Sequence, residues 1–197
     1  GVDIIKVGIG PGSICTTRMV AGIGVPQITA IMEVHKALKG KKTKIISDGG
    51  IKFSGDIAKA IAAGADAIMM GSIFAGTHES PGKKFKIKNK FYKQYRGMGS
   101  IGAMSAGSSN RYFQKNYKDK SKFVPEGVDG RVEYKGNVSK IIYQLKGGLR
   151  SSMGYIGAKK LNNIKKNAKF IKITKAGFYE SMVHSVEMIE TTLNYKL

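Results

Sequence analysis

Three short apolar runs near the start of the chain are predicted to be strands. They cover residues 4–7, 44–47 and 67–70, and each has the length of a buried strand. Longer stretches with helical spacing separate the runs, which is the order of βα units in a parallel sheet. The pattern therefore predicts an α/β fold for the first 75 residues.

Two helices are expected between these strands. Over residues 26–38, apolar side chains recur at the three- and four-residue spacing of a helix. The second helix is predicted to begin at Ser54, a favourable N-cap residue, and to end at Gly64, where a left-handed glycine often follows a helix.

Each predicted strand runs directly into a loop that contains glycine. The loops cover residues 8–13, 48–50 and 71–72. Because the carboxyl ends of parallel strands meet at one edge of a sheet, and ligands bind at that edge, we expect the three loops to share one pocket.

The regular alternation stops at Thr77. Residues 77–136 are basic, polar and rich in glycine, and an insertion of this length is typical of an active-site flap. Helical spacing returns over residues 137–149. The tail from residue 164 is mixed, and only a short strand near residues 170–173 is predicted there.

The composition is that of a globular domain with a packed core. Of the 197 residues, 42% are hydrophobic and 24% charged. The single cysteine, Cys15, excludes an intramolecular disulfide and a multi-cysteine zinc site. No apolar run reaches the length of a membrane span, and the first residues lack the layout of a signal peptide. We therefore expect a cytoplasmic protein that does not bind a membrane.

The strong positive charge raises the question of a polyanionic partner. The chain has 34 Lys and Arg against 13 Asp and Glu, a formal net charge of +21. These basic residues are spread over three stretches, 83–96, 115–122 and 159–175, and no nucleic-acid-binding motif accompanies them. A solvated lysine-rich surface is the favoured interpretation, and a nucleic-acid-binding protein is an alternative.

Cys15 stands in a polar, glycine-containing loop beside Thr16, Thr17 and Arg18. Such a setting favours an exposed and reactive thiol, although a lone cysteine is also commonly a small buried side chain. The loop is a poor match to the dinucleotide-binding fingerprint, since Ser13 occupies the place of the last glycine.

The neighbouring loops contain groups that suit a nucleoside monophosphate. The Asp48 carboxylate can accept two hydrogen bonds from a ribose diol, or it can form a local turn. The amides of Gly50 and Gly71, with the hydroxyls of Ser13 and Ser72, can surround a phosphate. Together these features predict a nucleotide held in front of a thiol.

Five segments of the chain, in order, resemble the inosine-5′-monophosphate (IMP) dehydrogenase family. They are Gly10-Pro11-Gly12-Ser13-Ile14-Cys15-Thr16-Thr17-Arg18, Ser47-Asp48-Gly49-Gly50-Ile51, Tyr95-Arg96-Gly97-Met98-Gly99-Ser100, Arg111-Tyr112-Phe113-Gln114 and Pro125-Glu126-Gly127. The guanosine monophosphate reductase family resembles the cysteine loop too, but it lacks the Tyr95 and Arg111 segments. That family is the second alternative.

The resemblance implies NAD-dependent oxidation of IMP to xanthosine 5′-monophosphate (XMP), a step of guanine nucleotide biosynthesis. Cys15 is then the nucleophile that attacks C2 of the hypoxanthine ring, giving a covalent thioimidate that water hydrolyses. Arg111 is implied as the hydrolytic base. Tyr112 and Thr17 are implied to orient the water, and Thr17 with Glu126 offers another route for the proton.

The resemblance also implies sets of binding residues. The implied substrate-binding residues are Ser13, Asp48, Gly49, Gly50, Gly71, Ser72, Tyr95, Arg96, Gly97, Met98, Gly99 and Glu126. The implied NAD contacts are Gly8, Ile9 and Gly10. The implied ligands of a potassium ion are main-chain carbonyls of Gly10, Gly12 and Cys15, with Glu180, Ser181 and Met182 of a neighbouring subunit.

Sharing of that ion between subunits implies a homotetramer. The fold implied by the family is a (β/α)8 TIM barrel, which typically needs about 250 residues. We therefore expect residues 1–197 to form the C-terminal part of one barrel domain, with residues 77–136 as an inserted flap and residues 164–197 as a tail.

Overall fold

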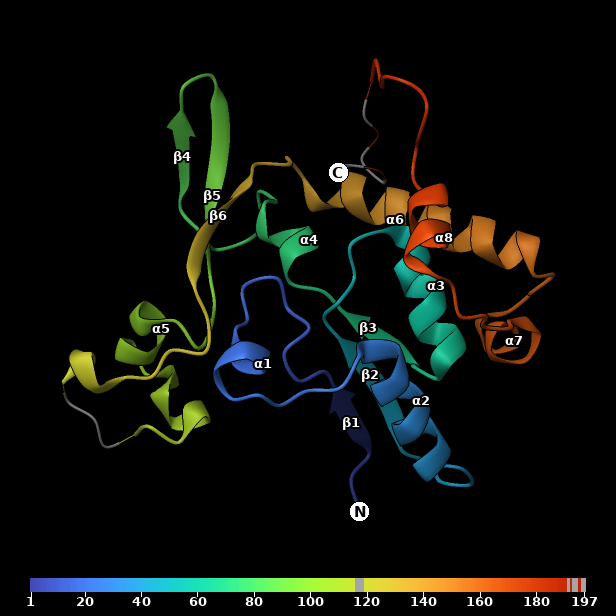
Figure 1. Ribbon diagram of the computed structural model, residues 1–197, viewed down its shortest axis with the longest axis horizontal. Helices are drawn as coiled ribbons and strands as arrows, with labels where there is room; N and C mark the ends of the chain where they lie inside the picture. The colour runs from blue at the N-terminus through green and yellow to red at the C-terminus, as the bar shows by residue number, and fades with distance from the viewer. Residues whose placement is uncertain (116–118, 191, 193–194, 196–197) are drawn as a thin grey trace.

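A parallel sheet of three strands forms the centre of the α/β part (Figure 1). The computed structural model describes residues 1–115 and 119–190, with Thr192 and Tyr195. The strands are β1 (Ile4–Val7), β2 (Lys44–Asp48) and β3 (Ala67–Met69), in the order β1-β2-β3. The three predicted strands and the mixed α/β class are thus confirmed.

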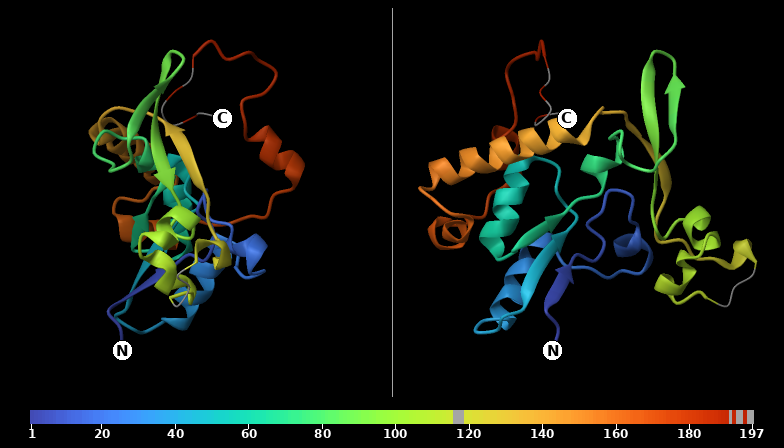
Figure 2. Two further views of the ribbon diagram at one scale, coloured as in Figure 1. Left: turned by 90° about the vertical axis from the view of Figure 1, so that its left-hand side faces the viewer. Right: turned by 180° about the vertical axis from the view of Figure 1, so that it is seen from behind.

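Helices cover one face of this sheet. Helix α2 (Gln27–Ala37) packs on β1 and β2, and α3 (Ser54–Ala63) packs on β3 and on α2. Helices α6 (Val138–Tyr155) and α7 (Leu161–Asn167) lie outside α3, as Figures 1 and 2 show. The core between these layers is built from aliphatic side chains, among them Ile31, Ile45, Ile61, Ile141 and Ile164.

The opposite face of the parallel sheet is more exposed. Side chains alternate between the two faces of a strand, so Val7 and Ile45 point to the helices while Ile4 and Met69 point away from them. Ile4 and Met69 keep 55% and 49% of their surface exposed. The Lys6 and Asp48 side chains belong to this second face.

The insertion folds as a second sheet, which the sequence pattern did not predict. Strands β4 (Lys84–Ile87), β5 (Lys90–Arg96) and β6 (Asp129–Glu133) pair antiparallel. The β4–β5 turn consists of Lys88 and Asn89 alone, and Lys88 adopts a φ of 50°. Lysines alternate with apolar residues along β4, which is the period-two pattern of a half-buried strand, but from the sequence this stretch was interpreted only as lysine-rich surface.

Short helices complete the insertion. Helix α5 (Ile101–Ser105) and the 3₁₀ turns η1 (Ser108–Tyr112) and η2 (Lys120–Lys122) lie between β5 and β6. The insertion leaves and re-enters the α/β part at one neck. There, the Lys135 amide donates to the Gly76 carbonyl and the His78 amide to the Gly136 carbonyl, both at 2.8 Å.

Two sequence-based predictions are corrected. Residues 170–173 are not a strand, because their apolar side chains are largely exposed and the described part of the chain offers them no strand partner. Ser54 is the first residue of α3 rather than its N-cap. The Asp56 carboxylate caps the start of α3 by accepting hydrogen bonds from the amides of Lys52 and Phe53, both at 3.0 Å.

The other helix predictions hold with changed boundaries. Gly64 ends α3 with a φ of 129°, as expected for a glycine at that place. The helix predicted over residues 137–149 begins at Val138 and continues to Tyr155. The tail contains the end of α7 and helix α8 (Lys175–Glu180). Within the described residues, no helix combines the length and apolar character needed to cross a membrane.

Candidate functional site

The Cys15 loop joins β1 to the short helix α1 (Thr17–Val20) and is held by Arg18. The Arg18 guanidinium donates from Nε to the Ile9 carbonyl at 3.1 Å and from Nη2 to the Val25 carbonyl at 2.7 Å. A Cβ atom on Gly10 would lie 2.6 Å from the Arg18 side chain, and Gly10 has a φ of 76°. Glycine at this position therefore permits both the turn and the close approach of Arg18.

The thiol itself is half-buried and has a close polar neighbour. Cys15 Sγ lies 3.2 Å from the hydroxyl of the buried Thr17, and the Cys15 amide donates to the Gly12 carbonyl at 3.1 Å. Both contacts restrict the position of the Cys15 side chain. A nucleophile needs such restriction because its attack has a narrow geometry.

Backbone hydrogen bonds join the Cys15 loop to the insertion. The Thr16 amide donates to the Glu126 carbonyl at 2.9 Å, and the Val128 amide donates to the Ile14 carbonyl at 3.0 Å. The Glu126 amide in turn donates to the Gly99 carbonyl at 3.0 Å. Three segments far apart in sequence therefore form one hydrogen-bonded layer around Cys15.

A cavity of about 270 Å³ lies where these segments meet the ends of β1 and β2. Most of the predicted site residues line it. These are Gly8, Gly10, Gly12, Cys15, Asp48, Gly49, Tyr95, Arg96, Gly97, Met98, Gly99, Arg111, Tyr112 and Glu126. Pro11, Ile14 and Gly127 also line it and were not predicted as site residues, although each belongs to one of the resembling segments.

Tyr112 lines the cavity and interacts with Cys15, Arg111 and Glu126. Burial raises the pKa of Tyr112, the nearby Cys15 and Glu126 raise it further, and Arg111 opposes them. Tyr112 therefore keeps its proton at neutral pH and can donate a hydrogen bond. A Cβ on Gly99 would lie 2.8 Å from the Tyr112 ring, so only glycine at 99 admits the ring in this position.

Tyr95 lies beside two of the residues predicted to surround a phosphate, Ser13 and Gly71. Burial raises the pKa of Tyr95, a side-chain hydrogen bond with Ser13 opposes the rise, and the charge of Asp48 adds to it. The Tyr95 hydroxyl is also 2.7 Å from where a Cβ on Gly71 would be. Ser13 and Gly71 thus meet at Tyr95, although neither lines the cavity.

Other predicted residues lie outside the cavity lining. A Cβ built on Gly50 would lie 3.6 Å from Pro11 and 3.7 Å from Gln27. Ser72 begins the short helix α4 (Ser72–Ala75), and the Ile9 side chain is 57% exposed. Thr17 reaches the site through its contact with Cys15.

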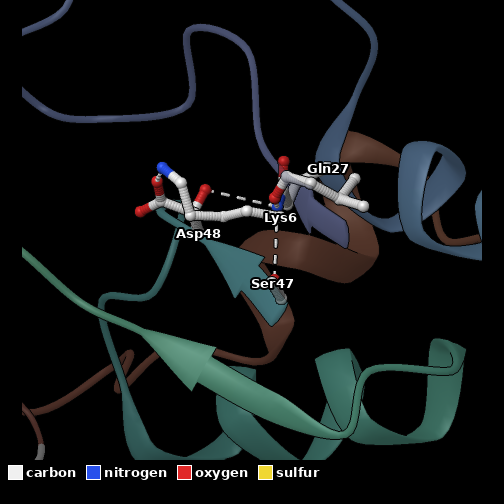
Figure 3. Close-up of polar contacts among 5 residues, drawn as sticks. Lys6, Gln27, Ser47 and Asp48 are labelled. Carbon is white, nitrogen blue, oxygen red and sulfur yellow. Dashed lines mark hydrogen bonds and ion pairs between the residues drawn. The ribbon is translucent and has the colours of Figure 1, made fainter. Parts of the chain in front are cut away.

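Lys6 and Gln27, which the sequence analysis did not identify, both approach Asp48 (Figure 3). The Lys6 ammonium contacts the Asp48 carboxylate on the exposed face of the sheet. The Gln27 amide approaches the Asp48 carbonyl at 3.4 Å from the helix-covered face. Lys6 could have been noticed, because it is the one charged residue in the apolar run of β1.

The predicted potassium ligands fall into two groups that this chain does not bring together. Gly10, Gly12 and Cys15 belong to the Cys15 loop, whereas Glu180, Ser181 and Met182 lie at the end of α8, which Figures 1 and 2 place apart from α1. Among the described residues, no cluster of three or more His, Cys, Asp or Glu side chains could hold a metal ion.

Comparison with known proteins gives a consistent family. Residues 1–184 match the model of the IMP dehydrogenase / GMP reductase domain. The chain is 57% identical over 197 residues to the inosine-5′-monophosphate dehydrogenase of Chlorobaculum parvum, covering 99% of this chain and 40% of that protein. Enzymes of the same name from Methanocaldococcus jannaschii and Cryptosporidium parvum are 56% and 55% identical. These alignments cover 100% and 99% of this chain, and 41% and 48% of those proteins.

Proposed function

The chain belongs to the IMP dehydrogenase / GMP reductase domain family, and from this we propose that the protein carrying it oxidises IMP to XMP with NAD. The chain spans about 40% of the length of relatives such as the Chlorobaculum parvum enzyme. The observation that carries the proposal is the convergence of Cys15, Asp48, Arg111 and Glu126 on one cavity.

The first half of the reaction is carried by Cys15. Its sulfur adds to C2 of the hypoxanthine ring, and the thiol proton passes to a base or to water. C2 becomes tetrahedral and loses its hydrogen as hydride to NAD, which leaves a thioimidate on Cys15. Asp48 would hold the ribose, and Tyr95 with Ser13 and Gly71 would hold the phosphate, so that C2 faces the sulfur.

The second half of the reaction is hydrolysis. Water adds to C2 of the thioimidate, the Cys15 sulfur leaves with a proton, and XMP is released. Arg111 and Tyr112 lie in the cavity with Cys15, which supports their assignment to the activation of this water. Thr17, 3.2 Å from the sulfur, is placed to pass a proton to or from this region.

The chain offers suitable groups for NAD and for a monovalent cation. Gly8 and Gly10 line the cavity next to Cys15, and Gly8 tolerates no side chain, because a Cβ there would lie 2.0 Å from the Asp48 carbonyl oxygen. NAD supplies the hydride acceptor. Main-chain carbonyls of Gly10, Gly12 and Cys15 suit potassium. The distant Glu180, Ser181 and Met182 would come from a neighbouring copy in the proposed homotetramer.

The wider assignments rest on the family. We propose that β1–β3 with their helices are part of a (β/α)8 barrel and that residues 77–136 act as its active-site flap. The reaction belongs to guanine nucleotide biosynthesis, and a cytoplasmic location is proposed with it.

Cys15 provides the direct test. In the complete protein, Cys15→Ala should abolish both NADH formation and the covalent adduct that mass spectrometry detects after mixing with IMP and NAD. Met19→Leu is the matched control, because Met19 lies in α1 with 88% of its surface exposed and should leave both readouts unchanged. An adduct on Cys15→Ala protein would contradict the assignment.

A further inference from the structure

The Gln27 side chain lies where two loops of the site begin (Figure 3). Gln27 is the first residue of α2. Its Nε2 lies 2.8 Å from the Val7 carbonyl, 3.2 Å from the Ser47 hydroxyl and 3.4 Å from the Asp48 carbonyl. One amide group therefore donates toward acceptors on both β1 and β2, at their carboxyl ends.

This is the point where the two strands separate. The pairing of β1 with β2 ends with Val7 opposite Ser47. Beyond this pair, β1 continues into the Cys15 loop and β2 into the loop of Asp48 and Gly50. The stem of Gln27 also faces Gly50, since a Cβ built on Gly50 would be 3.7 Å from Gln27 Cβ and Cγ. Gln27 thus contacts the start of both loops.

The amide is held in one orientation. Gln27 Oε1 is buried and has no hydrogen-bond donor among the described residues. A buried acceptor without a partner costs free energy. Exchanging the two ends of the amide would instead bring Oε1 against the carbonyl oxygens of Val7 and Asp48, which cannot donate a hydrogen bond. The two carbonyls therefore fix the side chain despite that cost.

We propose that Gln27 is a positioning residue that sets the distance between the Cys15 thiol and the ribose bound by Asp48. The inference rests on the proposed IMP oxidation. Gln27 acts through Val7 and Asp48, so it influences attack of sulfur on C2 more than it influences affinity for IMP. A small displacement of reacting groups is enough to slow such a step strongly.

Two variants of the complete protein test this role. Gln27→Met keeps the length of the side chain and removes the donor, and Gln27→Glu keeps its shape and places a carboxylate against the three acceptors. Ser47→Ala is the matched control. It removes one buried acceptor of Gln27 but leaves the bonds that join the two loops.

Three readouts separate positioning from general damage. The rate of the first NADH burst should fall at least about tenfold in both Gln27 variants, while the Kd for IMP changes less than about threefold. The rate at which iodoacetamide alkylates Cys15 should remain within about twofold of wild type, since that small reagent needs no bound ribose. Ser47→Ala should lose less of the burst rate than Gln27→Met.

The outcomes are distinct. A burst rate close to wild type in both Gln27 variants would overturn the proposal. A parallel loss of burst rate and alkylation rate, or an equal loss in Ser47→Ala, would show a structural role and overturn it as well. Failure of the wild-type protein to form NADH from IMP would instead contradict the proposed function.

Discussion

Lys6 and Asp48 contact each other on the exposed face of the parallel sheet. Lys6 pairs in register with Ile46, so Asp48 lies two residues farther along β2 and on the same face. The ammonium of Lys6 therefore restrains the carboxylate that we assign to the ribose, while Gln27 restrains the Asp48 carbonyl from the opposite face.

Loss of this contact should weaken substrate binding. In the complete protein, Lys6→Met should raise the KM for IMP by about three- to tenfold, because a charge-assisted contact contributes about 1 kcal/mol when partly exposed. Steady-state kinetics at saturating NAD provides the measurement. Lys6→Arg, which keeps the charge, should recover most of the affinity, and an unchanged KM in Lys6→Met would show that Asp48 needs no such restraint.

Arg111 should matter after the hydride has left. Arg111→Ala is expected to give a normal burst of NADH followed by a slow steady state, because we assign Arg111 to the proposed hydrolysis of the thioimidate. Pre-steady-state absorbance measures both phases. Arg131→Ala, on β6 and outside the cavity, is the control. Loss of the burst in Arg111→Ala would place Arg111 in binding or hydride transfer instead.

Asp66 gives the stability of the α/β part a predictable pH dependence. Burial opposes its ionisation, but the hydrogen bond from the Ile45 amide at 2.9 Å and the Lys165 ammonium at 3.0 Å outweigh it and lower the pKa of Asp66 below its ordinary value of 3.8. A depressed pKa contributes stability above pH 3.8 that is lost as the pH falls through the folded-state pKa.

Asp66→Asn should therefore lower the unfolding free energy by about 1 kcal/mol at pH 7, and the difference from wild type should shrink below pH 4. Chemical denaturation at several pH values measures this. The exposed Glu33→Gln is the control. A difference that grew on acidification would contradict the argument.

The exposed sheet face predicts the behaviour of the 197-residue polypeptide on its own. Ile4 and Met69 are about half exposed there, and such a surface favours aggregation over catalysis. We expect no NADH from this polypeptide with IMP, NAD and potassium. Co-expression with the remaining part of the proposed barrel should restore activity, and a Cys15→Ala form should not. Full activity of the polypeptide alone would disprove the proposed dependence on further strands.

The sequence predicted the parallel sheet because its signals are local. The apolar runs of β1–β3 and the glycine after each strand reflect burial and tight turns within a few residues. The antiparallel sheet was missed, since its pairing of β5 with the distant β6 depends on contacts that no local pattern records. The five segments that resemble the IMP dehydrogenase family contain most of the residues that line the cavity, so the cavity could largely be predicted from them.

Gln27 and the neighbours of Asp48 could not be found in the same way. The Gln27 side chain reaches Val7 and Ser47, 20 residues away in each case. Only the packing of α2 on the sheet places the amide at the strand ends. Glutamine at the start of a helix carries no signal of its own.

Among the described residues, backbone hydrogen bonds attach the insertion to the rest of the molecule at two places, the neck at Gly76 and Gly136 and the layer that links Glu126 and Val128 to the Cys15 loop. A hinge at the neck alone would break or drag the second attachment. Any swing of the insertion that keeps those hydrogen bonds must therefore carry the Cys15 loop with it. The proposed change from hydride transfer to hydrolysis would then be easiest if only the η1 segment with Arg111 and Tyr112 moved.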